Sequence, residues 1–299
     1  MAHAASQKLK GTGVALVTPF NPDNSIDYNG LKKLVHHMVD NGVDYLVILG
    51  TTGESPTISK QEKQTILETI RTENNGRLPL VLGIGGNHTL EVAEAIKYQD
   101  LDGISAILSV SPYYNKPNQQ GIIKHYTHLA DISSLPILLY NVPGRTGSNI
   151  STETTLKLAE HPNILGTKEA SGNFTQCMDI LKNRPDNFAV ISGDDALTHP
   201  FLSLGMDGVI SVIANAYPKT FSDMVRLGLN GNFKDALPLH NQLLDAMNLI
   251  FADGSPGGIK VLLEALGICG TTVRMPLHDV SEKVRQALLD TMNTTAVQR

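Results

Sequence analysis

One lysine follows a short apolar run near the middle of the chain and is itself followed by small residues. It is Lys168, in the stretch ILGTKEASG at 164–172. A lysine inside a sequence is usually a solvated surface charge, but a lysine that ends a buried parallel strand points into a dry pocket. Burial disfavours the ammonium form, and the neutral amine can then attack a carbonyl carbon. On spacing alone, both interpretations stay open.

Two threonines stand between glycines at the end of another apolar run. Thr51 and Thr52 lie in the sequence GTTGES at 50–55. Their hydroxyls, together with backbone amides that the glycines allow to face inward, would form a cradle that suits a carboxylate. A plain Thr/Gly turn is the alternative.

Tyrosines and an arginine follow two further apolar runs. The first leads into SPYYNKP at 111–117, and the second ends as YNVPGRTG at 140–147. A buried tyrosine is usually a core residue and a loop arginine is usually solvated, so neither indicates a site alone. An amine nucleophile, phenols that move protons and groups that bind carboxylates are together what a Schiff-base lyase of 2-oxo acids requires. The protonated imine acts as the electron sink, so we expect no cofactor.

Eight apolar, β-branched runs recur along the chain, each followed by a polar loop and a stretch with helical periodicity. Their starts lie 20 to 34 residues apart, the spacing of a βα unit. Runs that are apolar on both faces indicate strands buried in a parallel sheet. The 299-residue chain is therefore predicted to form an α/β fold, a (β/α)8 TIM barrel with a C-terminal helical appendage. The expected strands are 13–20, 44–50, 78–86, 103–111, 136–143, 164–171, 188–195 and 208–215.

Helices are expected between the strands, for example over 59–74, where Ser59 and Glu62 match a capping box. From about residue 231 no strand signal remains. We therefore expect a catalytic barrel over 1–230 and a C-terminal helical subdomain over 231–299. The expected helices of this subdomain lie near 232–251, 257–268 and 278–294.

The charge of the chain limits its partners. It has 24 basic and 29 acidic residues, a net charge of -5, spread without blocks. No basic surface is expected for nucleic acid or an anionic membrane, so a small-molecule partner is predicted. No run approaches the ~18 apolar residues of a membrane span, and the start lacks a signal-peptide core. We expect a soluble, cytoplasmic protein, with Cys177 and Cys269 buried and reduced within helical stretches.

Other polar signals have simpler explanations than a cofactor or metal site. The sequence GIGGNH at 83–88 lacks the third glycine of a dinucleotide-binding motif, and close backbone packing explains it. Asp194 and Asp195 could bind a divalent metal, but an acidic helix start explains them. We expect no metal site, because only His88 and His199 come near the predicted strand ends. The histidines expected on solvated helix faces are His36, His37, His125 and His128.

Four motifs, in their order and spacing, resemble the dihydrodipicolinate synthase (4-hydroxy-tetrahydrodipicolinate synthase) family of class I aldolases. They are TTGES at 51–55, PYYN at 112–115, YNVPGRT at 140–146 and KEASG at 168–172. The resemblance runs from about Gly11 to about Asn293. It implies an enzyme that condenses pyruvate with L-aspartate 4-semialdehyde to give 4-hydroxy-tetrahydrodipicolinate, in lysine and diaminopimelate biosynthesis.

The resemblance also implies roles for individual residues. Lys168 would form the imine with pyruvate, and Tyr140 would position and protonate groups near it. Thr52 would join Tyr140 to Tyr114 in a proton relay, with Tyr114 reaching across a tight dimer interface into the neighbouring site. A homotetramer built from two such dimers is implied.

Substrate-binding groups follow from the same resemblance. Thr51 and Thr52 would hold the pyruvate carboxylate. Backbone groups near Gly193 and Ile210 would line the pocket. Arg145 would clamp the carboxylate of the second substrate.

Two alternatives stay open. Sialic-acid lyases and sugar-acid aldolases share the lysine and the tyrosine, but they usually lack the Arg145-Thr146 pair and tend to carry serine in place of Thr51. An N-acetylneuraminate or 2-keto-3-deoxy-sugar-acid aldolase is therefore the alternative within the superfamily. A non-catalytic barrel that binds a 2-oxo acid is the alternative from another class.

An allosteric site for L-lysine also maps onto this chain by resemblance. Many inhibited members of the family carry imidazoles where this chain has Lys60 and Lys63. Two ammonium groups beside a cationic ligand would oppose its binding, so we expect weak or absent feedback by L-lysine. The mapped residues are Ser55, Pro56, Ile58, Asn87, Glu91 and Tyr113.

Overall fold

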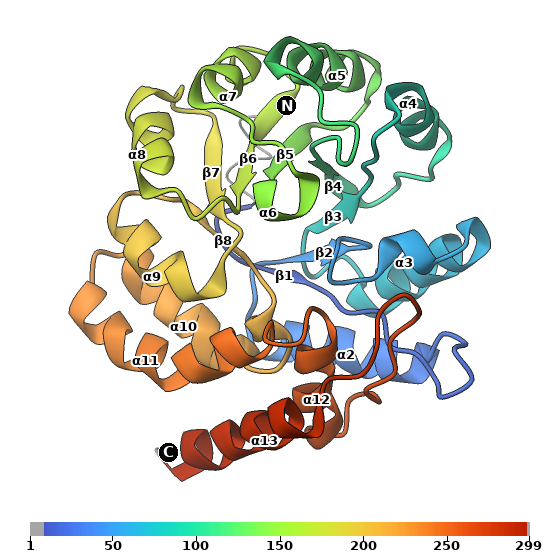
Figure 1. Cartoon of the computed structure of the whole chain (residues 1–299), viewed down its shortest axis with the longest axis vertical. Helices are drawn as coiled ribbons and strands as arrows, with labels where there is room; N and C mark the ends of the chain where they lie inside the picture. Colours follow the sequence, from blue (N-terminus) through green and yellow to red (C-terminus); the bar gives the residue numbers. More distant parts are fainter. Residues whose placement is uncertain (1–8, 298–299) are drawn as a thin grey trace.

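The strands form a closed barrel (Figure 1). The computed structural model describes residues 9–297. Eight parallel strands pair in sequence order, and β8 pairs with β1 to close the ring. The predicted (β/α)8 barrel is confirmed. The strands are β1 (Gly11–Ala15), β2 (Tyr45–Ile48), β3 (Leu80–Gly83), β4 (Ile104–Val110), β5 (Ile137–Asn141), β6 (Ile164–Glu169), β7 (Ala189–Ser192) and β8 (Gly208–Ser211).

The helices between the strands form an outer ring around the barrel (Figure 1), because each buries its apolar face against the sheet. The predicted capping box is present. The Ser59 hydroxyl accepts from the backbone N–H of Glu62, and the Glu62 carboxylate accepts from that of Ser59. The helices of the ring are α2 (Tyr28–Asp40), α3 (Lys60–Asn74), α4 (Thr89–Tyr98), α5 (Gln119–Ile132), α7 (Thr152–Ala159), α8 (Phe174–Asn183), α9 (Asp195–Ser203) and α10 (Pro218–Leu229).

Short helices follow three of the strands. They are η1 (Ser55–Thr57), α6 (Pro143–Thr146) and η2 (Ile213–Asn215). Two of these helices, α6 and η2, begin within segments that were predicted to be strand. The strand predicted over 208–215 therefore ends early, at Ser211. The strand predicted over 13–20 likewise runs only over β1, and at Val17 a side chain replaces the partner strand as hydrogen-bond acceptor. Asn215 accepts from the backbone N–H of Val17 at 3.3 Å and donates to the carbonyl of Ala15 at 2.9 Å.

A layer of apolar side chains fills the barrel below the strand ends. Tyr45 is its largest buried member, and its hydroxyl donates to the carbonyl of Val209 at 3.3 Å. Gly13 leaves room for this ring, because a Cβ at that position would lie 2.1 Å from a ring carbon. Full burial of a large apolar side chain stabilises the fold by about 1.5–3 kcal/mol. These packed side chains support the carboxyl ends of the strands from inside the barrel.

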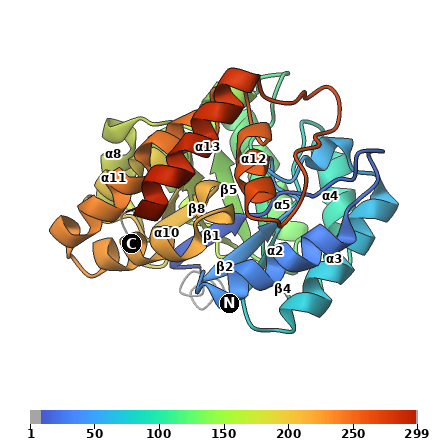
Figure 2. The ribbon, with the colours of Figure 1, turned by 90° about the horizontal axis from the view of Figure 1, so that it is seen from below.

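The C-terminal helices lie along one side of the barrel (Figure 2). They are α11 (Phe233–Leu249), α12 (Gly257–Ala265) and α13 (Glu282–Val297). Helix α11 packs on α9 and α10, whereas α13 packs on α12 and α11. Because α12 ends at Ala265, Cys269 does not lie in a helix, contrary to prediction, although both Cys177 and Cys269 are buried and free.

The solvated position predicted for His125 is wrong. This side chain on α5 is only 3% exposed, and its ring packs edge-on against Tyr126 with centroids 5.1 Å apart. The buried positions Ile122, His125, Tyr126 and Leu129 have the spacing of a single helix face, which here faces the barrel. His36 and His128 are exposed as predicted, and His37 is half-buried. Within residues 9–297, no helix is both long and apolar enough to cross a membrane.

Candidate active site

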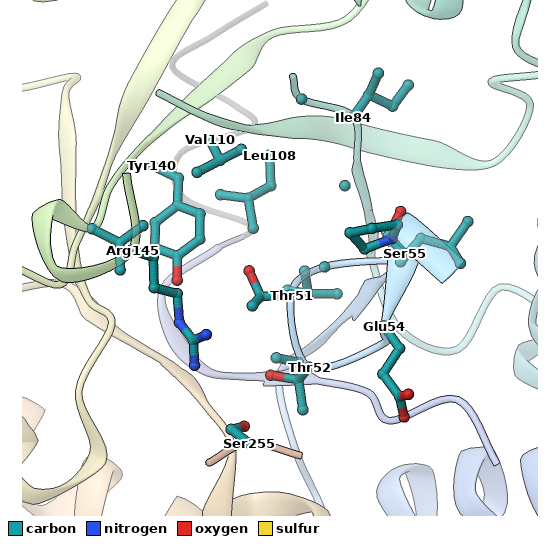
Figure 3. Close-up of a pocket in the computed structure, with 18 of the residues that line it drawn as sticks. Thr51, Thr52, Glu54, Ser55, Ile84, Leu108, Val110, Tyr140, Arg145 and Ser255 are labelled. Atoms are coloured by element: carbon teal, nitrogen blue, oxygen red, sulfur yellow. The ribbon is translucent and has the colours of Figure 1, made fainter. Parts of the chain in front are cut away.

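A cavity of about 510 Å³ opens at the carboxyl ends of the strands. In parallel barrels this is the end at which loops bring functional groups from different strands together. Thr51 and Thr52 reach the cavity from the loop after β2, Tyr140 from β5, Arg145 from α6 and Lys168 from β6. In Figure 3, the side chains of Tyr140, Arg145 and Thr51 point toward one another across this cavity. The structure therefore gathers five of the predicted site residues around one space.

Lys168 is held in a dry position beside a phenol. Its side chain is 6% exposed, and its Nζ lies 4.3 Å from the centre of the Tyr140 ring. The two residues are direct partners in the register between β5 and β6. Gly193, after β7, leaves space for the lysine, because a Cβ there would lie 3.0 Å from the Lys168 Cε. Gly193 thus contacts the lysine stem but does not line the cavity itself.

A buried polar network holds the ends of β5 and β6 from behind. Glu169 is 1% exposed, and its carboxylate accepts from the Asn141 amide at 3.0 and 3.2 Å and from the Gln176 amide at 3.2 Å. It also accepts from the backbone N–H of Ser171 at 2.7 Å. Asn149 completes the network by accepting from Asn141 at 2.8 Å. Because the Glu169 carboxylate accepts from three different residues, the network fixes the strand ends that carry Tyr140 and Lys168.

The loop after β2 that carries Thr51 and Thr52, here called the threonine loop (residues 50–55), is attached to its surroundings just after Thr52. Thr52 is buried, whereas Thr51 is exposed to the cavity. The carbonyl of Gly53 accepts from the Thr18 hydroxyl at 2.7 Å. Glu54 follows with a φ of 54°, in the left-handed region that non-glycine residues rarely adopt. The loop is therefore held in one defined conformation.

Arg145 has a free guanidinium. Helix α6 begins with Pro143, and the backbone N–H of Arg145 donates to the carbonyl of Val142 at 2.9 Å. Within residues 9–297, the Arg145 side chain has no hydrogen bond and no ion pair. A cation without a partner at the mouth of a cavity is suited to bind an anion.

Like Gly193, two further residues predicted for catalysis or substrate binding, Tyr114 and Ile210, lie outside the cavity. Tyr114 is 88% exposed, has a φ of 71° and does not line the cavity of its own chain. Its backbone N–H donates to the carbonyl of Thr146 at 3.4 Å, which ties this tyrosine loop to α6. Ile210, 1% exposed, packs in the barrel interior below the cavity. Tyr113, which directly precedes Tyr114 in the sequence, does line the cavity.

Comparison with known proteins agrees with this geometry. A sequence model of the dihydrodipicolinate synthetase family matches residues 8–295. The chain belongs to this family. A 4-hydroxy-tetrahydrodipicolinate synthase of Parabacteroides distasonis is 51% identical over 289 residues, which cover 95% of this chain and 97% of that protein.

Solved structures of the dihydrodipicolinate synthase family share nearly the whole fold. The chloride-inhibited enzyme of Acinetobacter baumannii, solved in complex with pyruvate, is 36% identical, with a TM-score of 0.94 over 97% of this chain and 99% of that chain. A monomeric dihydrodipicolinate synthase variant is 33% identical, with a TM-score of 0.94 over 97% and 98% of the two chains. The agreement extends over the barrel and the C-terminal helices together.

The residues mapped to the family's lysine pocket divide into two groups. Ser55, Pro56 and Tyr113 line the same cavity as Lys168, and so does Lys63. Burial lowers the pKa of the Lys63 ammonium, whereas Lys60 is exposed. The other mapped residues lie outside the cavity: Ile58 is buried in the core, the Asn87 carbonyl accepts from Asn115, and Glu91 is exposed on α4.

Several cavity residues were not predicted from the sequence. Ser255, Pro276 and Leu277 come from the C-terminal segment and form part of the wall. Glu54 also borders the cavity, although no role was predicted for it. Two proline-bearing loops around 253–258 and 274–277 were the available signal, but nothing local in them indicates that they cover strand ends.

The alternative explanations for other polar motifs are consistent with the structure. A Cβ at Gly83 would lie 2.5 Å from the Leu49 carbonyl oxygen, and one at Gly85 would lie 2.8 Å from Val110, so close packing accounts for these glycines. Asp194 is the N-cap of α9, where its carboxylate accepts from the backbone N–H of Leu197 at 3.1 Å. No group of three or more potential metal-ligating side chains is present in the described part of the chain.

Proposed function

We propose that this chain is a 4-hydroxy-tetrahydrodipicolinate synthase that condenses pyruvate with L-aspartate 4-semialdehyde. One observation carries the proposal: a buried lysine beside a phenol shares a cavity with two threonine hydroxyls and an unpaired guanidinium. The name of the Parabacteroides distasonis relative and the pyruvate complex of the Acinetobacter baumannii enzyme support the choice of substrates.

The first half of the reaction needs a nucleophile and proton transfer. The neutral Lys168 amine attacks C2 of pyruvate to give a carbinolamine, and loss of one water then gives the imine. Removal of a methyl proton from the protonated imine gives the enamine. The positively charged nitrogen accepts the electron pair of the broken C–H bond. We assign the proton transfers at these steps to Tyr140, whose ring centre lies 4.3 Å from the Lys168 nitrogen, and such transfers contribute typically about 10²–10⁴-fold. The Thr51 and Thr52 groups bind the pyruvate carboxylate.

The second half joins the two substrates. The enamine carbon attacks the aldehyde carbon of the semialdehyde, and the new alkoxide takes a proton to become the 4-hydroxyl. The amino group of the second substrate then displaces the Lys168 amine from C2, which closes the ring and frees the enzyme. Arg145 holds the carboxylate of the semialdehyde during these steps, since its guanidinium has no competing partner among the described residues.

The proton path is completed by a second subunit in this proposal. Tyr114 is held by its backbone with its side chain 88% exposed, which suits a residue that enters the site of a neighbouring chain and meets Thr52 there. We propose a homotetramer of two tight dimers on this basis. Because one solved member of the family is a monomeric variant, the assembly needs its own measurement, by sedimentation velocity. A wild-type monomer with full activity would refute this part.

Reduction with borohydride tests the function directly. In the presence of pyruvate, borohydride should trap the imine as a covalent adduct, which mass spectrometry of peptides would locate on Lys168. Lys168→Ala should abolish the adduct, whereas Lys182→Ala, which removes an exposed lysine, should not. Absence of an adduct on the wild-type chain would favour the non-catalytic alternative. Turnover of N-acetylneuraminate but not of the semialdehyde would favour the sugar-acid aldolase.

A further inference from the structure

A fully buried ion pair joins the threonine loop to the C-terminal helices. The Glu54 carboxylate lies after β2, and the Lys260 ammonium lies on α12. Their Oε1 and Nζ atoms are 2.6 Å apart, both side chains are 0% exposed, and the residues are 206 positions apart in the chain. Neither charge belongs to the proposed chemistry.

Each of the two charged groups makes one further hydrogen bond. Lys260 Nζ also donates to the carbonyl of Thr272 at 2.7 Å and lies 4.4 Å from the centre of the Phe20 ring. The second oxygen of Glu54 accepts from the backbone N–H of Arg274 at 2.9 Å. A buried ion pair generally adds little stability compared with apolar residues of the same volume, because desolvation offsets the attraction. The best-supported benefit of such a pair is that it defines one specific geometry.

The pair fixes the end of the carboxylate cradle. Glu54 follows Thr51 and Thr52 with one glycine between, and its backbone N–H donates to the carbonyl of Thr51 at 3.1 Å. Its left-handed backbone turns the side chain away from the cavity, whereas Thr51 faces the space beside Arg145 (Figure 3). With Thr18 bound to the Gly53 carbonyl, the loop has two attachments directly after its threonines. The hydroxyl positions therefore depend on where Glu54 is held.

Arg274 connects the Glu54–Lys260 pair to the cavity wall. Its guanidinium lies 4.5 Å from the centre of the Phe20 ring and donates to the carbonyls of Thr57 at 2.9 Å and Asn24 at 2.7 Å. It also pairs with Glu62, whose pKa it lowers to about 2. The segment continues directly into Pro276 and Leu277, which line the cavity. The C-terminal segment thus holds the loops after β1 and β2 and closes one side of the site.

We propose that Glu54 and Lys260 are positioning residues that hold the two threonines in the geometry that receives the pyruvate carboxylate. The C-terminal helices then set the affinity for pyruvate without touching it. The inference rests on the proposed function, since it assumes that the threonines bind pyruvate.

Three variants separate geometry from charge and from stability. Glu54→Gln and Lys260→Met each leave one buried charge unpaired, whereas the double variant E54Q/K260M removes both and keeps the net charge constant. The double variant should fold, because neutral replacements of buried pairs are generally tolerated. Loss of a negative charge alone would strengthen binding of an anion, whereas loss of positioning weakens it, so Glu54→Gln distinguishes the two effects by sign.

The measurement is the pyruvate concentration that gives half-maximal borohydride trapping, together with the steady-state KM values. We expect this concentration to rise about 10- to 100-fold in Glu54→Gln and in the double variant, with a smaller change in KM for the semialdehyde. Thermal unfolding should show the double variant to be more stable than either single variant, although its pyruvate affinity stays low. An unchanged half-saturation in the folded double variant would overturn the inference.

A matched control lies at the other end of the barrel. Arg184 and Asp207 also form an ion pair between segments distant in sequence, but Asp207 directly precedes β8 at its amino end. The double variant R184M/D207N should lower thermal stability and leave pyruvate half-saturation unchanged. If the wild-type chain itself gives no adduct, the proposed function fails. If wild type is trapped and the Glu54 variants match it, only the positioning role fails.

Discussion

Lys168 and Glu169 are adjacent on β6, yet their side chains lie on opposite faces of the sheet: the lysine enters the cavity, and the carboxylate enters the network with Asn141 and Gln176. Alternation along a strand makes this arrangement unavoidable. The proposed nucleophile and the residue that fixes its strand are therefore neighbours in sequence.

Glu169→Gln should weaken that network. The new amide group would place a donor against the donors of Asn141, Gln176 and the Ser171 backbone. A buried donor left without an acceptor costs about 1–3 kcal/mol, so the free energy of unfolding in urea should fall by that amount and imine trapping should slow. Glu160→Gln, which alters an exposed pair with Lys157, should change stability little, and equal effects of the two variants would contradict the role given to the network.

Arg145→Ala should separate the two half-reactions. Because the guanidinium is free to bind the second substrate, its loss should lower kcat/KM for the semialdehyde by about 10- to 100-fold, the effect of one charged hydrogen-bonded contact. Borohydride trapping with pyruvate should remain. Arg145→Lys should recover only part of the rate, since a point charge cannot bind bidentately. Normal semialdehyde turnover by Arg145→Ala would contradict the role given to Arg145.

Asp195 should make the fold less stable as the pH rises. Its carboxyl is 3% exposed, one oxygen accepts from the backbone N–H groups of Val212 and Ile213, and burial raises its pKa to about 6 from 3.8. The folded state therefore binds the proton more tightly than the unfolded state. This contribution is complete below about pH 3.8 and is lost as the pH rises through 6.

Urea unfolding between pH 4 and pH 7 checks this against Asp195→Asn, which cannot titrate. The unfolding free energy of wild type relative to the variant should fall by roughly 2–3 kcal/mol over that interval. Two curves that run parallel across the interval would show that Asp195 keeps an ordinary pKa.

His125 should make the fold less stable as the pH falls. Burial, with a smaller contribution from His128, lowers its pKa to about 4 from 6.5. The unfolded chain then binds the proton more readily, so stability falls as the pH drops from 6.5 toward 4. His125→Gln, whose amide can still meet the Thr89 hydroxyl, should lose this acid sensitivity of roughly 2–3 kcal/mol. His128→Gln, an exposed control, should retain it.

L-Lysine should inhibit weakly. Lys63 places an ammonium on the cavity wall with Ser55 and Tyr113, and a cationic amino acid would be repelled there. Initial rates at saturating pyruvate should stay nearly constant as L-lysine is added, while the double variant K60H/K63H should become more sensitive. Strong inhibition of the wild type would contradict the expectation.

Local patterns were sufficient to predict the barrel and the residues at its strand ends. Each βα unit carries its own apolar run and loop, so the parallel arrangement alone brings Thr52, Tyr140 and Lys168 together. The strand lengths were overestimated because residues such as Leu16 and Val17 stay buried after the chain leaves the sheet. A run of apolar residues indicates that the segment is buried. It does not indicate whether the backbone of that segment is hydrogen-bonded to a neighbouring strand.

The contribution of the C-terminal segment could not be predicted in this way. Glu54 and Lys260 each resemble an ordinary surface charge, and their pairing depends on packing between parts of the chain 206 residues apart. His125 was misplaced for a related reason, since a histidine on an otherwise apolar helix face is buried only if a partner such as Thr89 receives it. Tertiary contacts decide such positions.

The 206-residue separation of Glu54 and Lys260 also has a consequence during synthesis. Chains grow from the amino end, so the nucleophilic lysine leaves the ribosome well before α12 does. A nascent or truncated chain that stops short of residue 260 carries Lys168 but lacks the residue that pairs with Glu54 after the two threonines. If Lys168 forms the proposed imine, efficient reaction with a keto acid would therefore require a polypeptide that is almost finished.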